Sequence, residues 1–150
     1  SSFEVINRFI HMGIEPYNLV AALNCIIAQR LIRILCQCKE QVPADKKEEY
    51  LRDSGLDYER HKDHKFYMEK ALGCDLCKGS GFRGRRAIIE ILEMNDDMKE
   101  LFMEKMSITG LKKKAKEAGT TFLREAALEL VLNGETSISE ANRVTFIEQL

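Results

Sequence analysis

Two pairs of cysteines, far apart in the sequence, constrain the fold of this chain more than any other feature. Cys74 and Cys77 stand in C-x-x-C spacing within the segment GCDLCKGSGFRGR, and thirty-five residues separate them from Cys36 and Cys38. A C-x-x-C pair can hold one ion, but a structural zinc needs four ligands. We therefore expect the chain to bring both pairs together, with Cys36, Cys38, Cys74 and Cys77 as the ligands of a structural zinc ion.

The first pair is shorter than the second. Only Gln37 separates its two cysteines, so their side chains would alternate in direction in extended backbone, and a tight turn is needed to bring both to one ion. A replacement ligand could come from His61, His64 or Asp75. The alternatives are four thiols without a metal and ordinary surface histidines. The glycines after the second pair allow backbone N–H groups to turn toward sulfur.

Composition excludes several classes of protein. The chain has five cysteines, of which Cys25 lies in an apolar pattern typical of a core. It shows no signal peptide and no apolar run of membrane-spanning length. These features argue against a secreted disulfide scaffold. The net charge of −1 gives no reason to expect a nucleic-acid partner. No phosphate-binding loop, nucleophile elbow or H-E-x-x-H motif occurs, so we expect no catalysis by this chain alone. It starts without methionine on an amphipathic segment, which suggests a fragment of a longer protein.

The hydrophobic pattern predicts a mainly α fold with a small β-containing metal-binding insertion. Helices are expected over 1–12 and 16–35, one exposed helix over 45–53, strands over 65–71 and 86–93, and further helices over 96–105, 107–118, 122–132 and 137–144. Ser137 and Glu140 have capping-box spacing at the start of the last helix. The chain thus divides into a helical segment 1–35, a cysteine metal-binding subdomain 36–86 with an inserted helix, and a C-terminal strand and helical subdomain 87–150.

Four motifs follow one another along the chain in a specific order. They are FIHMGIEPY at 9–17, AQRLIRILC at 28–36, GCDLCKGSGFRGRRAIIEIL at 73–92 and TFLREAA at 121–127. In this order they resemble the C-terminal end of the ATPases of type II secretion and type IV pilus assembly. The resemblance extends roughly from Phe3 to Val144. One departure is the first cysteine pair, which in that family usually has two intervening residues rather than one.

The resemblance implies a fragment of a hexameric motor. The chain would be the tail of the α/β RecA-like domain of a P-loop ATPase, whose Walker motifs, ATP and Mg²⁺ lie upstream in the parent. It would serve as a structural and interaction region in a cytoplasmic protein, peripheral at the inner membrane. Its partners would be other subunits of the homohexamer and an inner-membrane platform protein. The resemblance makes a role at the subunit interface one interpretation of Gln29, Arg30, Arg33, Arg83 and Arg85. The alternatives are an exposed polar stripe for the first three and an ordinary ion-paired surface for the two others.

Two other functions remain as alternatives. The unit C-x-x-C-x-G-x-G also occurs in the zinc region of J-domain co-chaperones, but that region has four such repeats and this chain has one. The arginines after Gly81 could belong to a nucleic-acid-binding zinc module. The near-neutral charge and the lack of a row of stacking aromatic residues count against that hypothesis, whereas a steep salt dependence of DNA or RNA binding would favour it.

Overall fold

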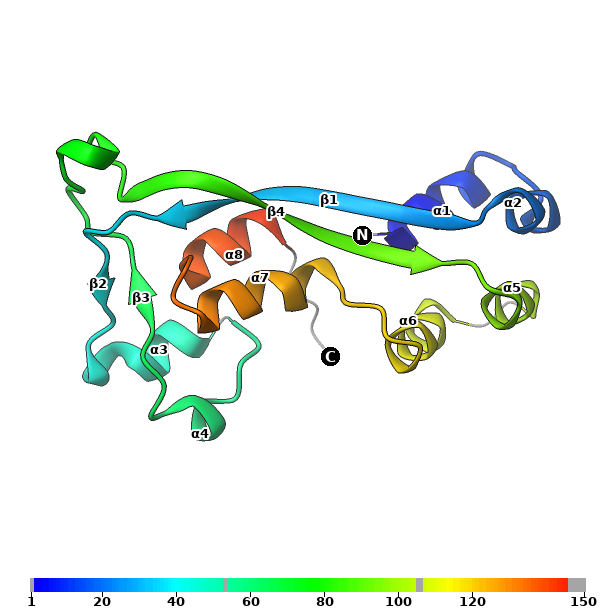
Figure 1. Cartoon of the computed structure of the whole chain (residues 1–150). Helices are drawn as coiled ribbons and strands as arrows, with labels where there is room; N and C mark the ends of the chain where they lie inside the picture. The colour runs from blue at the N-terminus through cyan, green and yellow to red at the C-terminus, as the bar shows by residue number, and fades with distance from the viewer. Residues whose placement is uncertain (1, 53, 105–106, 146–150) are drawn as a thin grey trace. The chain divides into compact units, whose positions relative to one another are not determined.

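The computed structural model describes residues 2–52, 54–104 and 107–145, and these combine helices, strands and a cluster of cysteines. They form two compact units: the first comprises Ser1–Gln29 and Ile89–Leu123, and the second comprises Arg30–Ile88 and Arg124–Leu150. Two long strands, β1 (Cys25–Leu35) and β4 (Phe82–Glu93), contribute residues to both units (Figure 1). The division into three segments expected from the sequence stays a prediction.

Strands β1 and β4 are hydrogen-bonded neighbours in a two-stranded sheet. At one end the Met94 N–H donates to the Asn24 carbonyl over 2.9 Å, and at the other the Cys36 N–H donates to the Gly81 carbonyl over 2.9 Å. Because the start of β1 lies beside the end of β4, the pair is antiparallel. The strand predicted over 86–93 is confirmed, and it begins earlier, at Phe82.

The helix predicted over 16–35 is wrong in its second half. Helix α2 covers only Pro16–Ala22, and β1 follows it. Along β1, Ile26 and Ile32 are 8% and 0% exposed, whereas Ile27 is 61% exposed, as the two-residue period of a strand requires. A short apolar run rich in β-branched residues is ambiguous by periodicity alone, and pairing with β4 decides it. The expectation that Cys25 lies in the core is also wrong, because it is exposed at the start of β1.

The first unit packs short helices around one apolar cluster. Its helices are α1 (Ser2–His11), α2, α5 (Asp96–Met103) and α6 (Ile108–Glu117). The cluster includes Phe3, Leu92 and Met98. The buried carboxylate of Glu90 accepts hydrogen bonds from the N–H groups of Ser2, at 2.7 Å, and Leu123, at 3.1 Å. Burial raises the pKa of Glu90, but these hydrogen bonds outweigh it and lower the pKa below its ordinary value.

The second unit contains the insertion between the two cysteine pairs. Its short strands β2 (Glu40–Gln41) and β3 (Tyr67–Met68) are antiparallel, with Gln41 opposite Tyr67. The single helix expected over 45–53 is instead a 3₁₀ turn, η1 (Ala44–Lys46), followed by α3 (Lys47–Arg52), and a further helix, α4 (Tyr58–His61), comes later. The strand expected over 65–71 is reduced to β3, because only that part has a partner in β2.

The C-terminal helices agree with the sequence pattern. Besides α5 and α6, they are α7 (Leu123–Leu132) and α8 (Ile138–Val144). The hydroxyl of Ser137 accepts the Glu140 N–H over 3.4 Å, which confirms the predicted start of α8. The expected end of the helix over 96–105, at Lys105, lies outside the described residues. Among the residues described, no helix is both long and apolar enough to span a lipid bilayer.

Candidate metal centre

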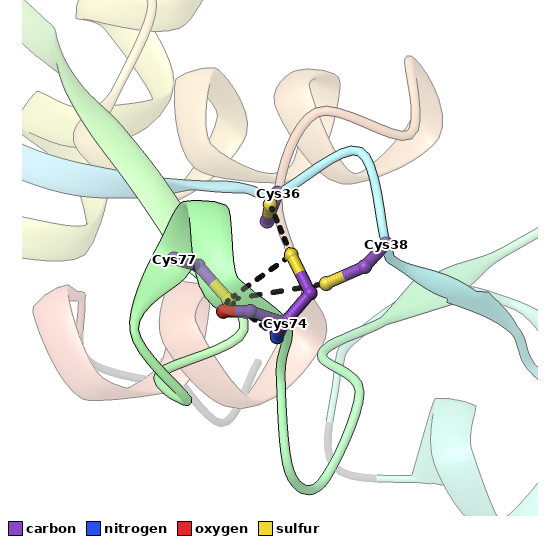
Figure 2. A group of neighbouring side chains, drawn as sticks. All are labelled: Cys36, Cys38, Cys74 and Cys77. Carbon is purple, nitrogen blue, oxygen red and sulfur yellow. Dashed lines mark hydrogen bonds between the residues drawn. The ribbon is translucent and has the colours of Figure 1, made fainter.

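Four thiols meet where β1 ends and β4 begins (Figure 2). The Sγ atoms of Cys36, Cys38, Cys74 and Cys77 all lie within 4.8 Å of one another. Cys36 and Cys74 are 3.7 Å apart, Cys38 and Cys77 are 3.9 Å apart, and Cys74 and Cys77 are 3.8 Å apart. A tetrahedral zinc ion with four sulfur ligands would separate them by about 3.8 Å. The expectation that the two pairs meet is confirmed, and the four thiols could hold one metal ion.

A tight turn allows the shortened first pair to contribute both of its thiols. Cys36 directly follows β1, and its carbonyl accepts the Lys39 N–H over 2.9 Å, which closes a turn over these residues. Because Cys38 lies inside this turn rather than in extended backbone, its side chain can face the same centre as that of Cys36. The missing residue therefore does not exclude Cys38 from the cluster.

The second pair lies on a glycine-rich turn that directs N–H groups at sulfur. The Sγ atom of Cys77 accepts hydrogen bonds from the N–H groups of Cys74, at 3.1 Å, and Gly81, at 3.3 Å. Gly73 has a φ of +54°, and a Cβ placed there would lie 2.6 Å from Cys77 Sγ. This position therefore needs glycine both for its backbone conformation and for the space beside sulfur. N–H donors facing a sulfur atom fit a thiolate, the form that binds metals.

The thiol pKa values differ across the cluster. Burial raises the pKa of Cys77, but the N–H groups of Cys74 and Gly81 and the neighbouring thiols outweigh it, so the pKa falls to about 6. Burial, together with hydrogen bonds to the other three thiols, raises the pKa of Cys38 to about 12. The cluster thus stabilises one thiolate at neutral pH, and a cation would favour the deprotonated form of all four.

Neither His61 nor His64 belongs to the cluster. Nδ1 of His61 donates to the Asp57 carbonyl over 2.8 Å, and Nε2 of His64 donates to the Leu132 carbonyl over 2.8 Å. Within the described residues, the four cysteines are the one group of three or more potential metal ligands that lie this close together. The replacement ligands considered from the sequence, His61, His64 and Asp75, are not part of it.

The predicted interface residues lie on the two long strands. Gln29 and Arg30 are exposed on β1, and Arg83 and Arg85 are exposed on β4. Arg33 differs from these four, because its guanidinium stacks over Phe82 with 4.2 Å to the ring centroid and also pairs with a buried carboxylate. A role for these residues at a subunit interface stays a prediction.

The carboxylate that Arg33 contacts belongs to Glu140, a residue that the sequence pattern indicated only as a helix cap. Its side chain is fully buried and accepts hydrogen bonds from the N–H and the guanidinium of Arg33 and from the guanidinium of Arg143, at 2.6 to 2.9 Å. Burial raises the pKa of Glu140, but the two arginines outweigh it and lower the pKa to about 2. The i, i+3 spacing of Glu140 and Arg143 was the one local signal for this ion pair.

The sequence of this chain is similar to a known protein family and to several known proteins. The family model described as "Type II/IV secretion system protein" matches residues 1–143. The type IV pilus assembly ATPase PilB of Thermus thermophilus is 37% identical over 138 residues, which are 91% of this chain and 15% of that protein. The type II secretion system ATPase E of Vibrio cholerae is 36% identical over 141 residues, 93% of this chain and 27% of that protein. PilB of Pseudomonas aeruginosa is 34% identical over 146 residues, 97% of this chain and 25% of that protein.

Proposed function

Since this chain belongs to the type II/IV secretion system protein family, we propose that it is part of an ATPase that powers type II secretion or type IV pilus assembly. The chain spans only 15% and 27% of the length of the two relatives from Thermus thermophilus and Vibrio cholerae, so the activity of the whole motor is part of this proposal. The four-thiol cluster supports a structural role for this region, because it joins the ends of two strands that carry motifs of the family.

We further propose that the four thiols bind one metal ion and that this ion is zinc. Four thiolates fill a tetrahedral coordination sphere and leave no position for a catalytic water, so the ion would supply a cross-link and no reaction. The cross-link would join Cys36 and Cys38, after β1, to Cys74 and Cys77, before β4. The long insertion between the pairs makes this closure entropically costly in the unfolded chain, and metal binding would offset that cost.

The remaining parts of the motor are proposed outside this chain. Nucleotide and Mg²⁺ would bind to other segments of a hexameric, cytoplasmic ATPase that is peripheral at the inner membrane and works on a platform protein there. The three-segment division of the chain belongs to the same proposal. The exposure of Gln29, Arg30, Arg83 and Arg85 supports their assignment to a subunit boundary. Arg33, which is hydrogen-bonded and ion-paired with Glu140, would hold the end of β1 beside that boundary.

The proposal is tested with the Cys74→Ser substitution in the full-length ATPase. We expect loss of the metal, measured by elemental analysis of protein purified without chelator, and loss of secretion or pilus assembly in the host cell. Nucleotide binding should be retained. The matched control is Cys25→Ser, because Cys25 is exposed and lies outside the cluster.

Each measurement addresses one part of the proposal. A Cys74→Ser protein that keeps one metal ion per chain would contradict the assigned ligands. Normal secretion and pilus assembly after loss of the metal would contradict its structural role in the motor. An equal loss of nucleotide binding would instead place the cysteine region at the active site.

A further inference from the structure

Three arginines surround an open hollow in the second unit. The hollow has a volume of about 380 Å³ and is lined by Leu31, Arg33, Arg85 and Arg143. These residues come from β1, β4 and α8, so segments far apart in the sequence build it. Such a concentration of guanidinium groups around one hollow is typical of sites that bind oxyanions.

The positive charge of this hollow is only partly compensated. Glu140 pairs with both Arg33 and Arg143, and its side chain is fully buried. Arg85 is exposed, and within the described part of the chain its guanidinium group makes no hydrogen bond or ion pair. Three cationic side chains therefore face one carboxylate, which leaves an excess of about two positive charges.

Glu140 also fixes the positions of two of the arginines and leaves some of their N–H donors unused. Arg33 binds it through Nε and one terminal nitrogen, and Arg143 does the same. A guanidinium group has five N–H donors in a fixed fork, so each of these arginines keeps further donors for a ligand. Because their positions are already fixed, a ligand would lose less free energy in ordering them.

We propose that this hollow binds the phosphate group of a phosphomonoester. Such a group carries a charge of about −1.5 to −2 at pH 7, which matches the excess charge of the hollow, whereas a carboxylate carries half as much. Arginine forks fit the oxygens of a phosphate in bidentate geometry. Leu31 provides an apolar wall for the part of the ligand next to the phosphate. This inference is independent of the proposed motor function, which the cysteine variants test.

The test is a titration of the 150-residue chain with glycerol 2-phosphate at constant ionic strength, followed by NMR of the backbone amides. We expect saturable shifts at Leu31, Arg33, Arg85 and Arg143, and no comparable saturation with acetate. The Arg85→Gln variant should bind about tenfold more weakly, since it loses a charge-assisted contact. Arg83→Gln is the matched control, because Arg83 is exposed on the same strand but does not line the hollow.

The outcomes separate a built site from a merely basic surface. Equal weakening by Arg85→Gln and Arg83→Gln, binding of acetate as tight as that of glycerol 2-phosphate, or a titration without saturation would overturn the proposal. An Arg85→Lys variant adds a check, because it keeps the charge and loses the fork. An affinity of Arg85→Lys that lies between the affinities of the original chain and of Arg85→Gln supports arginine-specific recognition.

A second arm identifies the source of the phosphate. Vesicles of phosphatidylcholine containing phosphatidic acid, a lipid with a phosphomonoester headgroup, are sedimented with the chain and with Arg85→Gln. Binding that is lost in the variant assigns the site to a lipid headgroup. Absence of vesicle binding, with glycerol 2-phosphate binding retained, assigns it to a free phosphomonoester.

Discussion

At the scale of single residues, Glu140 is held by hydrogen bonds from two arginines and has no contact with solvent. Replacing it by glutamine keeps the shape and removes the charge. We expect Glu140→Gln to lower the free energy of unfolding by about 1–3 kcal/mol, because it weakens charge-assisted hydrogen bonds at a buried site. Urea unfolding measures this. Glu117→Gln, at an exposed ion pair with Lys114, should cost about 0.5 kcal/mol or less.

Glu140 should also make the stability of the folded chain depend on pH. The pKa of Glu140 is about 2 in the folded chain and near the ordinary glutamate value of 4.5 when the chain is unfolded. A depressed folded-state pKa means that the stabilisation is complete above the unfolded value and is lost as the pH falls from there toward about 2. The stability difference between the original chain and Glu140→Gln should therefore shrink between pH 5 and pH 3. A difference that stays constant over this range would show that the ion pairs do not contribute.

At the scale of single residues, the turn that holds Cys74 and Cys77 depends on Gly73. Gly73→Ala places a Cβ 2.6 Å from Cys77 Sγ, so metal affinity should fall along with stability. The control is Gly55→Ala, which has a similarly positive φ of +81° but no atom within 4 Å of the added carbon. It should cost only the backbone strain, about 1–2 kcal/mol, and keep the metal. Competition with a chromogenic chelator measures both affinities, and equal values would exclude the steric explanation.

At the scale of elements, one side chain links three segments of the second unit. The hydroxyl of Tyr50, on α3, donates to the Tyr67 carbonyl on β3 and accepts the Ile138 N–H at the start of α8, both over 2.9 Å. Burial raises its pKa to about 12 despite the N–H of Ile138, so the hydroxyl stays protonated and can donate at neutral pH. The insertion is thereby connected to a C-terminal helix.

Tyr50→Phe should therefore destabilise the second unit. Loss of the hydroxyl leaves a carbonyl and an N–H without their partner, which costs about 1–3 kcal/mol. Amide hydrogen exchange at Ile138 should accelerate at the same time. Tyr58→Phe on α4, a partly exposed position, should change the stability by about 0.5 kcal/mol or less. Unchanged exchange at Ile138 would contradict a linking role for Tyr50.

At the scale of the whole molecule, the two units should respond differently to loss of the metal. All four thiols lie in the second unit, whereas the cluster of Phe3, Leu92 and Met98 lies in the first. Removing the metal with a chelator should accelerate hydrogen exchange over 36–41 and 67–86, because the closure of the insertion is lost. Exchange in α1 and α5 should change little. Equal acceleration in both units would mean that the metal supports the entire fold.

The sequence by itself determined the features that depend on few neighbouring residues. Apolar spacing predicted the C-terminal helices, and Ser137 predicted the start of the last one, because a helix cap acts over three or four positions. The ordered motifs indicated the family. The two cysteine pairs, with the glycines after them, were enough to expect that the thiols meet. Metal binding by these thiols, and zinc as the ion, stay predictions.

Only the tertiary structure decided the features that depend on distant partners. Residues 25–35 form a strand because β4 pairs with them, and Cys25 is exposed for the same reason. The burial of Glu140 between Arg33 and Arg143 likewise cannot be predicted from the local sequence. An apolar run satisfies a helix or a strand equally well, and a charge is buried only where the fold supplies its counter-charges, so these outcomes required the assembled chain.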